Sequence, residues 1–315
     1  MRWFDGHCDV LYRMWKEPNK HQFYHEECEL DVSYHKLMAG KVDIQVFAVF
    51  IPPKVAVRNR REVALKQIDL FYQNILAKSN KMKLIKGSFI TDRNDKRIGA
   101  MLALEGADAL EGDLLNLRIF YYLGVRQIGL TWNYANEVAD GIEEMRGAGL
   151  TEFGKRLLRE MNKLGMVADI SHLSVQSFWD VLAMPQVEIV ASHSNSFTVC
   201  PHKRNLTDEQ IKAIISRKGL IGLTFYPPFV AMKKQHVMIS DLLRHIDHVC
   251  ALGGGDHLVF GSDFDGIDQK INLLENASQL LHLKEVLCKY YEKSLVEKWA
   301  YTNANQFYSR VLAKL

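Results

Sequence analysis

The regular alternation of short apolar runs with amphipathic helical segments most limits the folds open to this chain. Runs of this kind occupy 42–52, 98–106, 125–133, 166–172, 188–194, 220–227 and 257–266, and an eighth, "WFDGHCDV", lies at 3–10. Runs that are apolar almost throughout suit parallel strands buried on both faces. Eight strands, most of them followed by a helix, over 315 residues predict a TIM-type (β/α)8 barrel.

An open doubly wound α/β sheet is the alternative arrangement of the same elements. That fold would need a glycine-rich phosphate-binding loop after the first strand, and "DGHCDV" at 5–10 does not provide one. We therefore expect a single barrel domain over residues 1–315. A polar, aromatic-rich and irregular insertion is expected at about 11–40, after the first strand.

The charge of the chain is mild and its distribution is ordinary. The formal net charge is +3, and the densest basic stretches lie at 58–62 and 78–86, within or just after a helical pattern. These stretches have no interleaved aromatic residues, so a solvated helix face explains them better than a nucleic-acid surface. We expect no nucleic-acid partner.

The cysteines and the apolar segments indicate a cytoplasmic protein. Five cysteines are scattered without a CxxC pair, which favours a reducing compartment over a disulfide framework. No signal-peptide pattern precedes the first strand. The most apolar stretch, at 42–51, is too short to span a bilayer and is interrupted by Gln45, so we expect no membrane partner.

Polar residues recur where the predicted strands end. In a (β/α)8 barrel those C-terminal strand ends form the active-site face. One such residue is usually just hydrogen-bonded, but six on one rim would repel one another and lose hydration at considerable cost. Bound divalent cations would compensate that cost. The six candidates are His7, Asp9, Glu105, His172, His193 and Asp263.

The candidate ligands offer oxygen and nitrogen atoms without thiolates, which suits zinc, with related divalent metals as alternatives. Three imidazoles and three carboxylates exceed the needs of one four-coordinate ion. They suffice for two ions that share a carboxylate and a hydroxide. His7 and Asp9 lie on one strand face and are expected to hold one ion together. Glu105 emerges between this pair and the later histidines, which makes it the natural bridge.

Several motifs resemble the renal (membrane) dipeptidase family, a group of binuclear zinc peptidases with an amidohydrolase-like barrel. The resemblance covers nearly the whole chain and is densest between 150 and 211. Its motifs include "DGHCD" at 5–9, "LALEG" at 102–106, "VADISHLS" at 167–174, "ASHSNSFTVCPHKRNLTDEQI" at 191–211 and "GSDFDG" at 261–266.

The resemblance implies one role for each candidate metal ligand. His7 and Asp9 would bind one zinc ion, and His172 and His193 would bind the other. Glu105 would bridge the two ions, and it is counted with the catalytic residues for that reason. Two Zn²⁺ per chain are thus the expected cofactors.

The resemblance also implies residues that handle the substrate. Arg204, in "HKRNLTD", matches an arginine that holds the C-terminal carboxylate of the substrate, a bidentate task suited to guanidinium. Asp263 matches an acid that lies near the bridging water and the substrate amine. Asp265 is the alternative, because "DFD" would place both carboxylates on one face if it were extended.

One position departs from the family pattern. Where many members have "LTH" at the end of the fourth strand, with a histidine that polarises the scissile carbonyl, this chain has "LTW". Trp132 donates only an indole N–H and is neither an acid nor a base. We interpret it as a wall of the substrate pocket, with packing under a loop as the alternative. Asn133 or Tyr134 could reach the carbonyl instead.

The function expected from these residues is hydrolysis of L,L-dipeptides, and of L,D-dipeptides as the resemblance implies, by a hydroxide that bridges two zinc ions. Another amidohydrolase activity, such as that of a lactonase or a deaminase, could use the same metal centre. A catalytically silent binding barrel is the third interpretation, raised by Trp132. A small dipeptide is the expected partner, and a homodimer is compatible with the chain.

Overall fold

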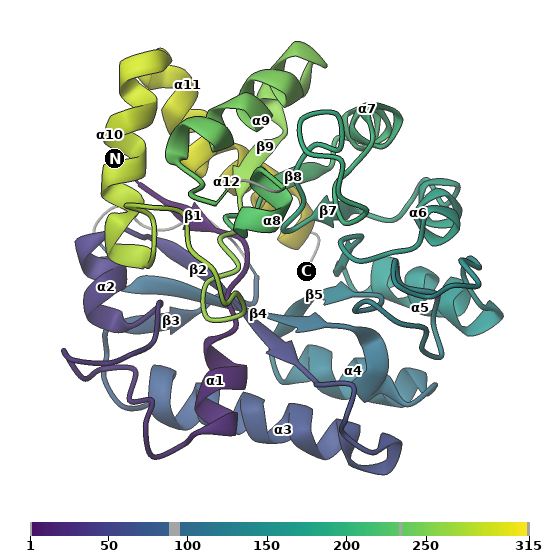
Figure 1. The fold of residues 1–315 in the computed structure, drawn as a ribbon. Helices are drawn as coiled ribbons and strands as arrows, with labels where there is room; N and C mark the ends of the chain where they lie inside the picture. The colour runs from purple at the N-terminus through teal and green to yellow at the C-terminus, as the bar shows by residue number, and fades with distance from the viewer. Residues whose placement is uncertain (1, 88–94, 233–234, 314–315) are drawn as a thin grey trace.

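The computed structural model describes residues 2–87, 95–232 and 235–313. Parallel strands form a barrel with helices outside it, which confirms the predicted (β/α)8 fold (Figure 1). Each of the barrel strands is hydrogen-bonded to the next one in chain order. They are β1 (Phe4–Asp5), β2 (Ile44–Phe50), β4 (Ile98–Glu105), β5 (Val125–Gly129), β6 (Val167–Asp169), β7 (Ile189–Ala191), β8 (Leu220–Leu223) and β9 (Leu258–Phe260).

The segment that follows β1 lies against β9 and nearly closes the barrel. The backbone N–H of Gly6 donates to the carbonyl of Phe260 over 2.8 Å. Beyond the strands, Cys8 and Phe264 form a parallel bridge, and the N–H of Asp9 donates to the carbonyl of Phe264 over 2.9 Å. This closure places the segment after β1 directly beside the segment after β9.

Helices form the outer layer of the barrel and also cover one of its ends (Figure 1). Phe307 and Val311 of the last helix share an apolar cluster with Phe4, Val46 and Met101 of the strands, so that helix plugs the barrel at its N-terminal end. The helices are α1 (Val10–Lys16), α2 (Tyr34–Ala39), α3 (Arg60–Leu70), α4 (Leu114–Tyr122), α5 (Glu152–Lys163), α6 (Val175–Leu182), α7 (Asp208–Ser216), α8 (Pro227–Val230), α9 (Ile239–Ala251), α10 (Leu280–Tyr290), α11 (Lys293–Glu297) and α12 (Asn303–Leu312).

A further strand, β3 (Met82–Leu84), was not expected from the sequence. It pairs with the start of β4, where Met82 lies opposite Ile98, before β5 joins β4 at Leu102. Three residues among lysines give no recognisable alternation, which explains why the basic stretch 78–86 reads as the end of a helix.

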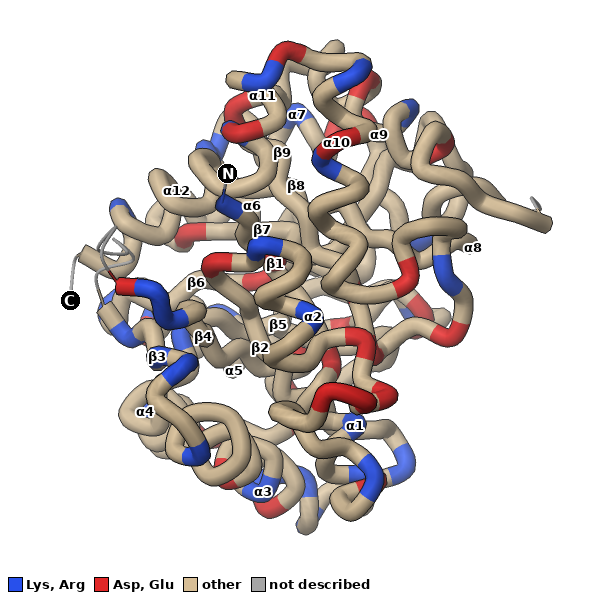
Figure 2. The backbone as a smooth tube through the Cα atoms, turned by 90° about the vertical axis from the view of Figure 1, so that its left-hand side faces the viewer, with Lys and Arg blue, Asp and Glu red and all other residues tan. Residues whose placement is uncertain are grey.

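The segment after β1 contains α1 and α2, with turns between them at 17–33. Basic and acidic positions lie interspersed along the outer helices (Figure 2). None of the helices in the described part of the chain has the length and apolar content that a bilayer crossing requires.

Candidate metal centre

The structure brings all six predicted strand-end residues together at the C-terminal mouth of the barrel. Their side chains are at least 85% withdrawn from solvent, so charges among them interact strongly. Glu105 ends β4, His7 and Asp9 follow β1, His172 follows β6, His193 follows β7, and Asp263 follows β9.

The carboxylate of Glu105 lies between two groups of candidate ligands. Its Oε1 is 3.0 Å from Nε2 of His172 and 3.7 Å from Nε2 of His193. Its Oε2 faces the other way and is 3.6 Å from Nε2 of His7. A carboxylate with one oxygen toward each group has the geometry that a bridging ligand needs.

His172 and His193 present nitrogen lone pairs to this centre. Nδ1 of His172 is 2.7 Å from Oδ1 of Asn133, and because an amide oxygen only accepts, Nδ1 carries the proton. Nδ1 of His193 is 2.7 Å from Oγ of Ser192. Burial lowers the pKa of His172 to about 4, with the Arg204 charge contributing, and it also lowers the pKa of His193. Both rings are therefore neutral near pH 7, as metal binding requires.

His7 and Asp9 form the second group. Nε2 of His7 is 3.4 Å from Oδ2 of Asp9 and 3.9 Å from Oδ1 of Asp263. Within the described ranges, neither ring nitrogen of His7 nor Oδ1 of Asp9 has a hydrogen-bond partner, although all three atoms are buried. Buried polar atoms are rarely left unsatisfied, so these orphaned atoms fit a site that binds a cation.

The pKa shifts of Asp9 and Asp263 indicate the same lack of positive charge. Burial raises the pKa of Asp9 to about 6, and repulsion from Glu105 adds to the shift. Burial raises the pKa of Asp263 to about 8; the His7 charge opposes this shift, and repulsion from Asp9 and Glu105 adds to it. Burial alone would lower the pKa of His7, but Glu105 and Asp9 raise it well above 6.5. Divalent cations would stabilise all three carboxylates.

Three candidate ligand groups occur among the described residues. Two of them share Glu105, and they are His7–Asp9–Glu105 and Glu105–His172–His193. The third contains Asp169, which the sequence did not single out, together with His7 and His193.

The carboxylate of Asp169, the last residue of β6, is hydrogen-bonded to neighbouring groups of the protein. Its Oδ1 accepts from the backbone N–H groups of Ser171 and Ser192, and its Oδ2 accepts from Nε2 of Gln127. Asp169 thus ties together the loops that carry His172 and His193. Asp169 lies inside the predicted run 166–172 and not at its end, so its charge within an apolar run is the one signal that could have found it.

Two of the site residues have left-handed backbone conformations. The φ angles of His172 and Asp263 are 70° and 65°. Residues other than glycine seldom adopt this region, and such residues cluster at functional sites. The conformation turns each side chain out of the strand direction and toward the centre.

Arg204 reaches the same mouth from the loop after β7. Its guanidinium is buried, its Nη2 is 3.4 Å from the carbonyl of His193, and it lies 5.5 Å from the ring centroid of Phe229. Its Nε has no hydrogen-bond partner in the described part of the chain. Burial lowers the pKa of Arg204 to about 10, so the group stays charged at neutral pH. The arginine can therefore donate to an anionic group.

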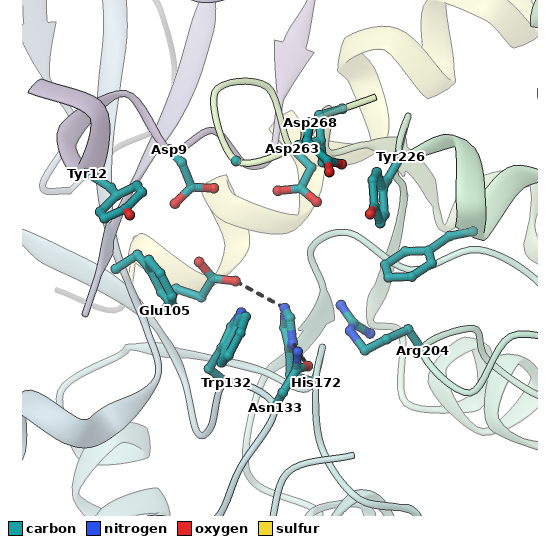
Figure 3. Close-up of a pocket in the computed structure, with 14 residues that line it drawn as sticks. Asp9, Tyr12, Glu105, Trp132, Asn133, His172, Arg204, Tyr226, Asp263 and Asp268 are labelled. Carbon is teal, nitrogen blue, oxygen red and sulfur yellow. Dashed lines mark hydrogen bonds and ion pairs between the residues drawn. The ribbon is translucent and has the colours of Figure 1, made fainter. Parts of the chain in front are cut away.

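These residues line a cavity of about 450 Å³ (Figure 3). Carboxylates, His172 and Arg204 face it, and aromatic side chains form much of the remaining wall. The lining residues are Asp9, Tyr12, Phe50, Glu105, Trp132, Asn133, His172, Arg204, Tyr226, Phe229, Asp263, Gly266, Ile267 and Asp268.

Trp132 lies in this wall, after β5. Its ring centroid is 5.3 Å from that of Phe50 and 6.1 Å from that of His172. Asn133 also lines the cavity, but its amide oxygen is directed at His172. Tyr134 is 53% exposed and packs 5.9 Å from Trp132. Trp132 thus lines the cavity and lies beside the ring of His172.

Asp265 points away from the centre. Extended backbone would place it on one face with Asp263, but both residues have positive φ, 68° and 65°. The carboxylate of Asp265 accepts from the backbone N–H groups of Asp31 and Val32 over 2.8 and 2.9 Å. Asp263, by contrast, lines the cavity beside His7.

Known proteins resemble this chain over nearly its whole length. A solved metallo peptidase of Rhodobacter sphaeroides, liganded with a phosphinate mimic of the dipeptide L-Ala-D-Ala, is 26% identical with a TM-score of 0.92 over 99% of both chains. The solved dipeptidase AC, a metallo peptidase of family M19, is 27% identical with a TM-score of 0.92 and the same coverage. An uncharacterized dipeptidase of Schizosaccharomyces pombe is 30% identical over 92% of this chain and 74% of its own length. The sequence model of the membrane dipeptidases matches residues 1–313. The chain therefore belongs to the membrane dipeptidase family, peptidase family M19, and its enzyme class is that of the metallo-dipeptidases.

Proposed function

We propose that this metallo-dipeptidase hydrolyses L,L- and L,D-dipeptides with two zinc ions per chain. The observation that carries the proposal is the placement of Glu105, whose two oxygens face two separate ligand groups in a cavity that also contains Arg204. The L-Ala-D-Ala mimic bound by the Rhodobacter sphaeroides relative supports the L,D part.

The residues present fit a pair of zinc ions. His7 and Asp9 would hold one ion, His172 and His193 the other, and Glu105 would contact both. Nitrogen and oxygen ligands with neutral imidazoles are usual for Zn²⁺. When bound, the cations would act as Lewis acids on the peptide carbonyl and lower the pKa of a water molecule.

Arg204 would bind the C-terminal carboxylate of the dipeptide. It is a buried cation that faces the cavity and keeps donor capacity free of the protein. Two parallel N–H···O bonds from guanidinium to carboxylate would fix the orientation of the substrate as well as attract it. This contact would place the peptide bond at a fixed distance from the metal ligands.

Asp263 would carry protons during the reaction. It is a carboxylate that lines the cavity 3.9 Å from Nε2 of His7, beside the candidate metal ligands. Such a group exchanges protons efficiently in both directions. Asp263 would accept the proton of the attacking water and donate it to the amine of the leaving residue.

Trp132 would limit the side chains that the cavity accepts. It contributes a large, rigid surface next to Phe50, and its indole does not titrate. It is therefore assigned to the wall of the pocket, and proton transfer is assigned to Asp263.

Metal analysis combined with a substrate panel tests the proposal. The chain, purified after growth with zinc, should contain two zinc ions and should hydrolyse some L,L- and L,D-dipeptides but not N-acetylated or amidated ones. Hydrolysis of lactones in place of dipeptides would identify another amidohydrolase activity. Metal without hydrolysis of any dipeptide or lactone would identify a silent barrel.

A further inference from the structure

We propose that Asp265 and Asp31 act as a reciprocal pair that positions Asp263 in the metal centre. Neither carboxylate lines the cavity, so both would act through the backbone that joins them to Asp263. This inference rests on the proposed function, because it assigns the pair a role in the reaction that Asp263 serves.

Each member of the pair binds the backbone of the other. The two carboxylate oxygens of Asp265 accept from the N–H groups of Asp31 and Val32 over 2.8 and 2.9 Å. Oδ2 of Asp31 in turn accepts from the N–H of Asp265 over 2.9 Å. Three hydrogen bonds thus join the loop after β9 to a segment more than 230 positions earlier in the chain.

A lysine adds a further contact to this junction. Nζ of Lys270 contacts Oδ2 of Asp31 and lies 5.5 Å from the ring centroid of Phe264. Phe264 is fully buried and stands between the two aspartates of "DFD". The contacts of Asp31 and Lys270 therefore hold both Phe264 and Asp265, the two residues that follow Asp263.

The other side of the loop is anchored to the metal-ligand segment. The N–H of Asp263 donates to the carbonyl of His7 over 3.1 Å, and the carbonyl of Phe264 accepts from the N–H of Asp9 over 2.9 Å. Asp263 thus sits on a short bridge that is fixed to the β1 segment on one side and to Asp31 and Val32 on the other. With positive φ at both 263 and 265, the bridge needs anchors to keep this conformation.

Gly266 shows how little room the loop has to move. A Cβ atom built there would lie 2.3 Å from Oδ2 of Asp9 and 2.8 Å from Oδ1 of Asp263. Both carboxylates therefore pack directly against the backbone that follows Asp265. A small displacement of this backbone would change the position of Asp263 relative to Asp9, and misplacement by about 1 Å costs about 100-fold in rate.

A graded set of variants tests the pair. Asp265→Asn keeps the size of the side chain but replaces one acceptor oxygen with an amide NH2 group, a donor that faces a backbone N–H. Asp31→Ala removes the return bond, whereas Asp31→Asn retains one oxygen for the N–H of Asp265. The matched control is Asp43→Asn. Asp43 directly precedes β2, away from the mouth, and is a partly buried carboxylate that accepts from the backbone N–H of Trp3.

We expect kcat for a dipeptide to fall about 10- to 100-fold in Asp265→Asn and Asp31→Ala, with KM changed less than threefold. Asp31→Asn should recover most of the activity that Asp31→Ala loses, and Asp43→Asn should stay within about twofold of the parent. Zinc content should remain at the parental value in every variant. Hydrogen exchange at the amides of Asp31 and Val32 should accelerate in Asp265→Asn but not in Asp43→Asn.

The outcomes separate this inference from the proposed function. If the parent hydrolyses dipeptides but Asp265→Asn loses no more activity than Asp43→Asn, the positioning role is wrong. The role is also wrong if the lost activity follows lost zinc, or if KM rises as much as kcat falls. If the parent hydrolyses no dipeptide, the proposed function fails, and the exchange measurement still reports whether the pair holds the loop.

Discussion

Nε2 of His172 lies 2.7 Å from Nε2 of His193, in the interior of the barrel mouth. The Nδ1 of each ring is already engaged, with Asn133 in one case and Ser192 in the other. Burial lowers the pKa of both rings, so each ring is neutral and carries one N–H at neutral pH. With the proton of His193 on Nδ1, both Nε2 lone pairs would be available to a cation, with Oε1 of Glu105 beside it.

The shared position of Glu105 predicts how the two proposed ions depend on each candidate ligand. Glu105→Gln should weaken both sites together, because its two oxygens face different ligand groups. His7→Ala should remove mainly one ion, since His7 belongs to one group. Elemental analysis of the dialysed proteins measures both effects. A parent protein with one ion or fewer after growth in zinc would contradict the binuclear centre.

Asn133 should matter for metal affinity as well as for the substrate. Its amide oxygen orients His172 and fixes the proton on Nδ1, and loss of such a partner typically lowers metal affinity about 10- to 100-fold. We expect this loss in Asn133→Ala, measured by competition with a chelator. Tyr134→Phe is the matched control on the next residue, and an equal loss in both variants would show that the loop acts without the His172 contact.

Arg204 should determine the requirement for a free C-terminal carboxylate. Loss of a buried, charge-assisted contact costs about 2–4 kcal/mol, so Arg204→Ala should raise KM at least about 30-fold. Amidation of the substrate should harm the parent strongly and the variant little. Steady-state kinetics provide the four KM values, for the parent and for Arg204→Ala, each with a free and an amidated dipeptide. If amidation of the substrate impairs hydrolysis equally in the two proteins, Arg204 has a structural role.

The meeting of the candidate metal ligands at one mouth follows from the sequence because parallel strand ends must meet at one face of a barrel. His172 and Asp263 were found this way although their left-handed φ angles were not foreseeable. The same reasoning fails for Asp265, because alternation of side chains applies only to extended backbone, and β9 ends at Phe260. Strand periodicity stops there, and the loop geometry decides where a carboxylate points.

Contacts between distant segments could not be predicted from the sequence. Asp31 lies in an irregular segment, and no local pattern indicates that its N–H would bind Asp265. Tyr12 and Asp268 line the cavity for the same reason, since tertiary packing brings their segments to the mouth. The short strand β3 forms only because β4 offers an edge before β5 joins it.

A buried histidine outside the centre predicts how stability depends on pH. Nδ1 of His245 accepts from the N–H of Ser196, and Nε2 donates to the carbonyl of Val230. Burial lowers its pKa to about 4, below the value of about 6.5 in the unfolded chain. Between these values the unfolded state binds more protons, so the stability due to His245 is complete above pH 6.5 and is lost as the pH falls toward 4.

The thermal midpoints of the parent and of His245→Gln, measured from pH 7.5 to pH 5, test this dependence. At pH 7.5 the free energy of unfolding of the parent should exceed that of His245→Gln. This difference should shrink by up to about 1.4 kcal/mol for each pH unit as the pH falls. Metal-linked effects are common to both proteins and cancel in the difference. A difference that stays constant over this range would show that His245 does not titrate in the way its burial implies.

Trp132 should control which dipeptides are accepted, without a part in proton transfer. Its indole lies in the cavity wall, 5.3 Å from Phe50 by ring centroids, so the volume it occupies is closed to substrate side chains. Trp132→His is smaller and should change the ratios of kcat/KM among dipeptides that differ in side-chain size, with zinc content unchanged. Trp132→Phe is the control that keeps an apolar ring and adds no titrating group. If the ratios stay flat in both variants and only the thermal midpoint falls, Trp132 serves packing beneath the loop. If Trp132→His instead raises kcat for every dipeptide equally, the position takes part in the chemistry and our assignment to the pocket wall is wrong.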